Sequence, residues 1–378
     1  MMSAPLARAT IYHFRHALPK PIPTVMGPMT HRPTLLLRLE DADGAHGWGE
    51  IWCNFPPDGD FHRARLANRV LPAALKDMSA ETPDAFAEIL RRLHRLIIQC
   101  GEPGPVAQIA CSADIALHDL RARRTGLSLS KTLGGTVNSV PAYASGISPD
   151  KAPEQIARMR TLGYQEFKQR IGFGLDDGIS AARETAQALH QGETLMLDAN
   201  QAWTLETAIG QGKRLSDLDL VWLEEPMAAD TSDADWRSLA DAVPMPLAGG
   251  ENLTGKALER AVSLGALGVI QPDICKWGGI STTLRIARAS LDAGRRYCPH
   301  FLGGGVGLTA SAHLLAAVGG DGVLEVDSSE NPFIPVFSGR GLALEDGHFP
   351  ISDAPGLGYD PDIDALKNLL VDSLEVTL

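Results

Sequence analysis

The chain has 378 residues, a formal net charge of −12 and a pI of about 5.4, and 44% of its residues are hydrophobic. An acidic chain without a long basic run lacks the positive surface that displaces counterions from phosphate, so we expect no nucleic-acid partner. No stretch approaches 18 uninterrupted apolar residues, and the five cysteines form no CxxC pair. These features predict a cytoplasmic globular protein with no membrane partner, long enough for two domains.

Residues 1–135 show no regular repeat of strand and helix, unlike the rest of the chain. Strand-like segments at 34–39 and 47–50 flank a turn at 41–44, which predicts a β-hairpin. A hairpin followed by helices predicts a separate α+β domain over residues 1–135. Apolar spacing, with Pro72 and Pro83 as punctuation, predicts helices over 62–77, 84–99 and 106–123.

From residue 136 the pattern changes to short apolar runs that alternate with helical segments. This repetition predicts an α/β fold, a TIM-like β/α barrel over residues 136–342. The Gly- and Pro-rich tail, residues 343–378, is expected to pack back on the N-terminal domain. The predicted strands are 142–144, 166–169, 195–197, 220–223, 245–248, 269–271, 297–299 and 323–326, and helical segments between them include 177–190, 204–215, 254–264 and 280–294.

Charged or ligating residues recur at the ends of these apolar runs, at intervals of 22 to 30 residues. This interval matches one strand, one helix and two loops. In a closed barrel the strand ends converge on one face, where active sites of this fold lie, so the recurring residues predict one site built from many strands. They are Lys168, Asp198, Glu224, Glu251, Asp273, His300 and Glu325.

Three of these residues are acids that follow successive strands, namely Asp198, Glu224 and Glu251. Carboxylates gathered in a cleft repel one another, and a divalent cation removes that repulsion. Oxygen ligands without Cys or His favour Mg²⁺ over Zn²⁺. The alternative for each acid is a barrel-rim group paired with Lys or Arg, or a helix N-cap. Glu224 and Glu225 compete for one ligand position, because successive strand residues point to opposite sides, and the pattern alone does not choose between them.

Together these motifs resemble the enolase superfamily, and specifically its mandelate racemase group. The resemblance extends over nearly the whole chain, because Trp48-Gly49-Glu50 and residues 114–120 look like the capping domain of that family. The barrel motifs that carry it are Asp198-Ala-Asn200, Glu224-Glu225-Pro226, Gly249-Gly250-Glu251-Asn252, Gln271-Pro272-Asp273 and Pro299-His300-Phe301.

The resemblance implies an N-terminal α+β capping domain over a (β/α)7β barrel, and a homo-oligomer. It implies one Mg²⁺ per subunit on Asp198, Glu224 and Glu251, with the first Glu of the pair as ligand. It also implies an Asp273–His300 dyad beside the substrate, whose carboxylate or enolate Glu325 would hydrogen-bond. The shared step of the family is removal of a proton α to a carboxylate. Histidine is a natural base near neutral pH, and a metal stabilises the developing charge.

The segment Phe167-Lys168-Gln169-Arg170 departs from the family pattern, because the racemase group has a Lys-x-Lys pair there. Strand alternation places Lys168 and Arg170 on the same face, toward the barrel interior. A guanidinium stays protonated and grips carboxylates, so Arg170 is a poor base and a good clamp. We therefore expect a one-base reaction. His300 removes the α-proton of an acid sugar, Lys168 neutralises the enediolate or acts as an acid or base, and a β-hydroxyl leaves as water.

Other functions remain open at this point. A sugar-acid lactone cycloisomerase is the main alternative, because Ile171-Gly-Phe-Gly174 and Asn331-Pro-Phe333 look like segments of lactone-opening relatives. A racemase or epimerase of a 2-hydroxy acid or amino acid derivative is another alternative. A non-catalytic sugar-acid binding protein would belong to a different class, and it has no need for a metal-linked base.

Several residues are predicted to contact the substrate, which we expect to be a small carboxylate of the acid-sugar class. Two loops of the capping domain, roughly 19–31 and 51–61, are expected to set selectivity. The glycine-rich segment 303–307 suits a flexible connection better than a phosphate cradle, because it lacks the P-loop Lys and Ser/Thr. The candidate substrate-binding residues are Trp52, Asn54, Asn200 and Lys276.

Overall fold

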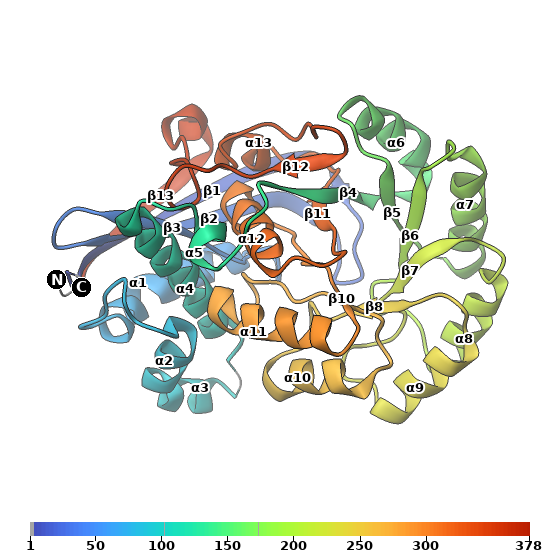
Figure 1. The fold of residues 1–378 in the computed structure, drawn as a ribbon, viewed down its shortest axis with the longest axis horizontal. Coiled ribbons are helices and arrows are strands. Elements are labelled where there is room, and N and C mark those ends of the chain that lie inside the picture. The colour runs from blue at the N-terminus through green and yellow to red at the C-terminus, as the bar shows by residue number, and fades with distance from the viewer. Residues whose placement is uncertain (1–3, 102, 173) are drawn as a thin grey trace.

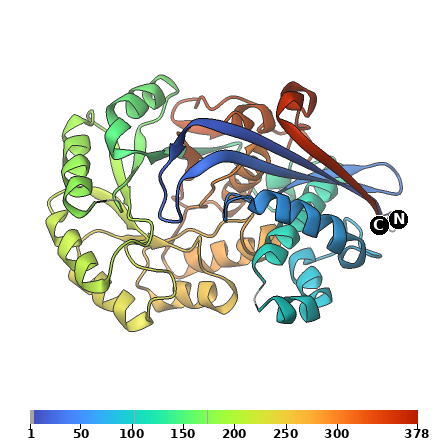
Figure 2. The same cartoon turned by 180° about the vertical axis from the view of Figure 1, so that it is seen from behind.

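The structure, a computed structural model, describes residues 4–101, 103–172 and 174–378. It has two parts, a small sheet with helices and a larger curled parallel sheet ringed by helices (Figure 1). The first described residues lie beside the C-terminus, where the backbone N–H of Leu378 donates to the carbonyl of Ala7 at 3.0 Å, at the far edge of the smaller part (Figures 1 and 2). Among the described residues, no helix is both long and apolar enough to cross a membrane.

The smaller part, the capping domain, is built on a four-stranded antiparallel sheet with the order β13-β1-β2-β3. The predicted hairpin is present as β2 (Met29–Asp41) and β3 (His46–Ile51). The long first strand β1 (Leu6–Ile22) and the last strand β13 (Leu370–Thr377) were not predicted. Because β13 pairs with β1, the C-terminal segment completes the capping sheet, and Figure 2 shows these strands running side by side.

The helices of the capping domain are α1 (Gly59–Ala74), α2 (Ala85–Arg92), α3 (His94–Cys100) and α4 (Gly104–Thr125). The prediction of one helix over 84–99 is wrong, because the chain breaks at the buried Leu93 and α3 buries none of its residues. Pro72 was expected to punctuate a helix, but it lies inside the last turn of α1, which ends at Ala74.

Helix α4 is buried along most of its length because it packs directly on β3. The approach is close enough to require glycine at Gly47 and Gly49, where an added Cβ would overlap backbone atoms of α4. At Gly49 the overlapped atom is the carbonyl oxygen of Ser112. The absence of side chains at Gly47 and Gly49 on β3 therefore allows the sheet and this helix to pack at a short distance.

Replacing Gly49 with alanine is expected to lower the free energy of unfolding by about 3 kcal/mol, since rigid backbone atoms must move to admit a methyl group. Urea denaturation measures the change. Gly210→Ala is the matched control, because Gly210 is exposed in α8 (Leu205–Arg214) and an added Cβ meets no atom within 4 Å. The control should be neutral or slightly stabilising. Equal stability of the Gly49→Ala protein and the wild type would contradict the packing argument.

The larger part is a (β/α)7β barrel, as predicted, in which the described residues form eight parallel strands that alternate with seven helices. Adjacent strands pair in the order β10-β9-β8-β7-β6-β5-β4-β11, and no pairing joins β10 to β11 in the described part of the chain. The strands are β4 (Ser139–Ile147), β5 (Glu166–Arg170), β6 (Thr194–Asp198), β7 (Leu220–Glu224), β8 (Leu247–Gly249), β9 (Val269–Ile270), β10 (Arg296–Tyr297) and β11 (Leu324–Asp327). The helices between them are α6 (Ala152–Thr161), α7 (Leu175–Ala188), α8, α9 (Asp233–Ala242), α10 (Gly255–Leu264), α11 (Gly279–Asp292) and α12 (Gly305–Val318).

The barrel interior is filled by a cluster of buried side chains that includes Tyr143, Met196 and Trp222. Side chains alternate along a strand, so residues two positions further along also point inward. Asp198 follows Met196, and Glu224 follows Trp222, in this way. The packed layer thus forms the floor on which the polar strand ends lie.

A buried carboxylate joins the capping domain to the barrel. Glu50 on β3 accepts hydrogen bonds from the backbone N–H groups of Gly304 and Gly307, at the start of α12. The glycine-rich segment is therefore a connection that binds an anion of its own chain, as expected for N–H groups at a helix N-terminus. The short strand β12 (His348–Pro350) pairs with β4, so the C-terminal segment contacts the barrel as well as the cap.

Candidate active site

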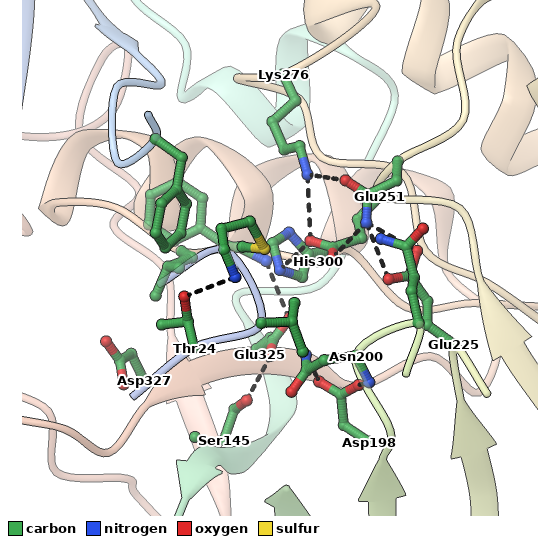
Figure 3. Close-up of a pocket in the computed structure, with 18 of the residues that line it drawn as sticks. Thr24, Ser145, Asp198, Asn200, Glu225, Glu251, Lys276, His300, Glu325 and Asp327 are labelled. Carbon is green, nitrogen blue, oxygen red and sulfur yellow. Dashed lines mark hydrogen bonds and ion pairs between the residues drawn. The ribbon is translucent and has the colours of Figure 1, made fainter. Parts of the chain in front are cut away.

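A cavity of 410 Å³ opens at the carboxyl ends of the barrel strands, beneath the capping-domain segment Thr24–Met26. Figure 3 shows the side chains that point into it from several strands and from the cap. The lining residues are Thr24, Val25, Met26, Trp52, Phe55, Gln108, Ser145, Gly146, Arg170, Asp198, Asn200, Gln201, Glu225, Glu251, Asn252, Lys276, His300, Phe301, Leu302, Glu325 and Asp327. Most of the predicted site residues therefore meet at one place.

Adjacent strands bring the three predicted acids together. Asp198 and Glu224 are register partners on β6 and β7, and Glu251 follows β8. Burial, and after it the charge of Glu224, raises the pKa of Asp198 to about 7, and Glu251 contributes in the same direction. Ionised carboxylates in this poorly solvated site are therefore disfavoured, first by burial and then by their mutual repulsion.

The structure distinguishes the two consecutive glutamates. Glu224 is buried beneath the cavity, where it pairs with Lys168 and accepts hydrogen bonds from Trp222 at 2.9 Å and Gln271 at 2.7 Å. Glu225 lines the cavity, and both its carboxylate oxygens accept from Asn252 Nδ2 at 2.9 Å. Burial and the charge of Glu251 raise the pKa of Glu225 well above its usual range.

The residues present fit a magnesium ion chemically, because they supply oxygen ligands, crowded negative charge and no thiolate. No three acidic, His or Cys side chains lie at metal-ligand spacing within the described ranges. Each acid instead contacts a neighbour, Glu224 through Lys168 and Glu251 through His300. Asp198 accepts hydrogen bonds from the backbone N–H and the side chain of Asn200, both at 2.8 Å.

His300 lies between two carboxylates. Its Nδ1 is 2.9 Å from Asp273 Oδ2, and its Nε2 is 2.5 Å from Glu251 Oε2. Asp273 is held in turn by the backbone N–H groups of Cys275 and Lys276. Burial alone would lower the pKa of His300, but the charges of Glu251 and Glu325 raise it well above its usual value. The arrangement fixes the imidazole and directs Nε2 toward the acid cluster (Figure 3).

Lys168 lies below the cavity in a buried ion-pair network. Its ammonium group contacts Glu224 and is 2.8 Å from Glu325 Oε1. Burial would lower the pKa of Lys168, but these two carboxylates raise it well above its usual value. Glu325 also accepts from Ser145 Oγ at 2.5 Å and from the backbone N–H of Phe301 at 3.0 Å. Glu325 reaches the cavity wall, whereas Lys168 does not line it.

Arg170 ends β5 and lines the cavity on the same strand face as Lys168. Burial lowers the pKa of its guanidinium, and the charge of Asp327 opposes that effect. Among the described residues no acidic side chain lies within 4.0 Å of it. Phe173, in the segment that resembles lactone-opening relatives, lies outside the described residues, whereas Asn331 of the second such segment donates to the carbonyl of Gly303 at 2.8 Å.

The four predicted substrate-binding residues divide into two groups. Trp52, Asn200 and Lys276 line the cavity, and the Lys276 ammonium lies 5.1 Å from the centre of a Trp52 ring. Lys276 also donates to Asn252 Oδ1 at 2.7 Å. Asn54 is buried away from the cavity wall and donates to the carbonyl of Leu302 at 2.6 Å. Its geometry suits holding a barrel loop, and its contact with substrate stays a prediction.

Sequence reasoning did not assign several residues that line the cavity. Ser145 on β4 and Asp327 on β11 are register partners on the first and last strands of the barrel. Asn252 directly follows Glu251 in the segment Gly249-Gly250-Glu251-Asn252, so its position beside a predicted metal ligand was a usable signal. Val25 and Met26 lie in the capping loop of roughly 19–31 that was expected to set selectivity, and they border the cavity although they are exposed by 44% and 56%.

Comparison with known proteins adds an independent finding. Residues 7–134 match the sequence model of the mandelate racemase / muconate lactonizing enzyme N-terminal domain. Residues 151–365 match the model described as enolase C-terminal domain-like. The two matches lie on the capping domain and on the barrel with the segment that follows it.

Individual relatives agree with these matches. The D-galactarolactone cycloisomerase of Agrobacterium fabrum is 32% identical over 368 residues, covering 93% of this chain and 95% of that protein. The L-talarate/galactarate dehydratase of Salmonella typhimurium is 31% identical over 342 residues, covering 88% and 81%. A solved mutant of L-talarate/galactarate dehydratase, liganded with Mg and L-glucarate, has a TM-score of 0.85 and 26% identity, covering 100% and 94%.

A further solved structure shares more of the sequence. The mandelate racemase/muconate lactonizing enzyme from Bordetella bronchiseptica RB50 is 44% identical, with a TM-score of 0.88, and the match covers 97% of this chain and 100% of that one. The agreement therefore extends over both parts of the fold.

Proposed function

The chain belongs to the mandelate racemase / muconate lactonizing enzyme family of the enolase superfamily, and on that premise we propose that it dehydrates an acid sugar. The proposed reaction removes the proton α to the carboxylate, expels the β-hydroxyl as water, and ends in a 2-keto-3-deoxy acid. The observation that carries the proposal is the position of His300, whose ring is fixed by Asp273 while Nε2 faces the acid cluster inside the cavity.

In this proposal the neutral form of His300 is the base that removes the α-proton, with Glu251, whose charge raises the pKa of His300, directed to the metal instead. The proton leaves carbon for Nε2, and Asp273 stabilises the imidazolium through Nδ1. General base catalysis of this kind contributes about 10²- to 10⁴-fold to the rate. Trp52 and Phe55 line the same cavity, so their rings help to exclude water from the reacting atoms.

Asp198, Glu224 and Glu251 are the residues that would hold a magnesium ion. Bound Mg²⁺ would supply fixed positive charge to the substrate carboxylate as negative charge develops on it. The likeness to a dehydratase structure that contains Mg supports this part of the proposal. The burial of Asp198 and the neighbouring charge of Glu224, which together raise its pKa, are consistent with it.

Lys168 and Glu325 would stabilise the enediolate from below. The Lys168 ammonium group is held between Glu224 and Glu325, where it contributes positive charge to the floor of the cavity. Glu325 is on the cavity wall, so its carboxyl group is placed to hydrogen-bond a substrate oxygen. We assign Lys168 an electrostatic role because its ammonium group does not reach the cavity wall.

A one-base site predicts the stereochemistry of the reaction. Arg170 occupies the position from which a second base would act, and a guanidinium does not release its proton near neutral pH. Substrate recovered from a partial reaction in deuterated buffer should therefore keep its α configuration. Proton NMR and chiral chromatography of the recovered substrate make the measurement. Accumulation of the α epimer would contradict the one-base assignment.

Lactone cycloisomerisation is the second candidate, favoured by the likeness to D-galactarolactone cycloisomerase over 93% of the chain. It shares the α-proton step, but a ring oxygen leaves in place of hydroxide. A screen of sugar acids and their lactones with Mg²⁺ in deuterated buffer separates the outcomes by NMR and mass spectrometry. Dehydration gives a product lighter by one water, whereas lactone opening gives an isomer of the lactone. Binding without α-proton exchange in any compound would reject both reactions and favour a binding protein.

A further inference from the structure

The capping domain contributes six of the described residues to the cavity wall, and most of them leave no free hydrogen-bonding group there. Val25, Met26 and Phe55 carry no hydrogen-bond donor in their side chains. The hydroxyl group of Thr24 is already engaged, because it donates to the carbonyl of Gly27 at 2.6 Å and accepts from the backbone N–H of Met26 at 3.2 Å. Only Trp52 and Gln108 remain to be considered on this side of the cavity.

The polar atoms of Trp52 and Gln108 differ in their access to the cavity. The indole nitrogen of Trp52 is enclosed and has no partner among the described residues. Gln108, from α4, lines the cavity although its exposed fraction is only 9%. Its Nε2 has no acceptor in the described part of the chain and is not enclosed. Gln108 therefore carries the accessible free donor of the capping-domain wall.

Arg63 determines which end of the Gln108 amide faces the cavity. Arg63 lies on α1, and its Nε donates to Gln108 Oε1 at 2.5 Å. A guanidinium has donors and no acceptor, so the amide oxygen must face Arg63 and the NH₂ group must point away from it. A hydrogen bond from a charged donor also polarises the amide, which makes its own N–H groups stronger donors.

Arg63 is buried in a position that suits orienting Gln108. Its Nη1 donates to a backbone carbonyl one turn earlier at 3.1 Å, and its Cζ lies 5.7 Å from the centre of a Trp52 ring. The neighbouring Asp60 is engaged by His13 at 2.6 Å, and no carboxylate lies within 4.0 Å of the Arg63 guanidinium among the described residues. The side chain that hydrogen-bonds this buried charge is thus a glutamine of the cavity wall.

We propose that Gln108 is a specificity-determining residue, whose Nε2 donates a hydrogen bond to a hydroxyl oxygen of the substrate beyond the reacting α and β carbons. The inference rests on the proposed function, which places the reacting carboxylate at the barrel strand ends. Gln108 comes from the opposite wall, so it meets the rest of the carbon chain. A neutral amide suits a hydroxyl group, since an enclosed carboxylate would need a cation and the capping-domain residues of the wall supply none.

The test uses the six-carbon monocarboxylic sugar acid that binds best, together with its monodeoxy analogues at carbons 4, 5 and 6. In the wild type, one of these analogues should show a kcat/KM about 10-fold lower than that of the parent, because the buried amide donor is then left without its partner. Calorimetry in a His300→Asn background, where turnover is slow, should give the same ratio of affinities. We call this ratio the deoxy penalty.

Two substitutions of Gln108 separate its contact with Arg63 from its contact with substrate. Gln108→Glu keeps a partner for Arg63 but removes the N–H donors, and Gln108→Leu removes both. Either variant should bind the parent sugar acid about 10-fold more weakly and reduce the deoxy penalty to about one. KM should rise while kcat changes little, because the contact is made before and during the reaction. Gln187→Leu is the matched control, because Gln187 is exposed on α7, and it should keep the full penalty.

Arg63 is a positioning residue in this proposal, since it touches Gln108 and does not line the cavity. Arg63→Lys should reduce the deoxy penalty, because a flexible ammonium group orients the amide less firmly than a planar guanidinium does. A purely structural role of Arg63 would lower the melting temperature and leave the penalty unchanged.

Two results would overturn the proposal. One is a wild type that binds all three deoxy analogues as tightly as the parent sugar acid. The other is a folded Gln108→Glu protein that retains the full deoxy penalty. Failure of the proposed function gives a different result, since no compound would exchange its α-proton while the calorimetric penalty and its dependence on Gln108 would persist.

Discussion

Replacing His300 with asparagine is expected to lower both turnover and α-proton exchange by about 10³-fold, within the range that a positioned general base contributes. Asparagine retains hydrogen-bonding capacity toward Asp273 but cannot accept a proton from carbon. Exchange of the substrate α-proton with deuterated solvent, followed by NMR, measures the base step separately from water elimination. The loss should be the same in both measurements, because elimination follows proton removal.

The control for this prediction is His348→Asn, which changes an exposed histidine on β12 whose Nδ1 contacts only the backbone of its own turn. It should leave exchange at the level of the wild type. Circular dichroism melting curves establish that both variants are folded. Undiminished exchange in folded His300→Asn would remove His300 as the base, and with it the observation on which the proposed function rests.

Replacing Asp198 with asparagine is expected to weaken Mg²⁺ binding by more than about 100-fold, since losing a direct ligand should cost at least as much as losing a supporting residue. In the wild type, Mg²⁺ at 100 times its dissociation constant should add about 2.7 kcal/mol to the free energy of unfolding, which thermal melting detects without any substrate. The variant should show no such shift. Chelation should abolish turnover in the wild type, and added Mg²⁺ should restore it.

Asp217→Asn is the matched control, because this acid is exposed and pairs with Arg183 on the barrel surface. Its Mg²⁺ response should equal that of the wild type. Comparing Glu224→Gln with Glu225→Gln then tests which glutamate binds the ion. We expect the Glu224→Gln protein to lose the stabilisation by Mg²⁺. If only the Glu225→Gln protein lost it, Glu225 and not Glu224 would be the metal ligand. An unchanged Mg²⁺ shift in Asp198→Asn would contradict the predicted site.

The polar residues at the strand ends were predictable because they recur once per strand-and-helix unit of the barrel. Each strand of a barrel ends at the same face, so regular spacing from Lys168 to Glu325 places these side chains together without knowledge of any contact. The alternation of strand residues also predicts that Lys168 and Arg170 share a face. Strand ends and the face to which a strand residue points can be predicted from sequence, because each prediction needs only a few neighbouring residues.

Contacts between distant segments were not predictable. Strands β1 and β13 pair Phe14 with Leu370, and neither segment signals its partner. The same applies to Glu50 with Gly304, and to Arg32 with Asp327, where one partner belongs to the cap and the other to the barrel. The different surroundings of Glu224, which ends β7, and of Glu225, which follows it, were also not predictable, and the choice of Glu224 as metal ligand stays a prediction.

The break between α2 and α3 illustrates a third limit. Apolar spacing continues through Leu93, and no glycine or proline marks the point where the helix ends. The chain turns there because Leu93 is buried while the following turn lies on the surface. Tertiary packing overrides helical periodicity in this segment.

The most direct test of the central claim is a crystal structure with bound Mn²⁺ and a substrate analogue that cannot react, because Mn²⁺ accepts the same oxygen ligands and gives an anomalous signal. The account predicts one anomalous peak contacted by Asp198, Glu224 and Glu251, with His300 Nε2 facing the α-carbon of the analogue. A peak elsewhere, or an analogue whose α-carbon faces away from His300, would contradict it.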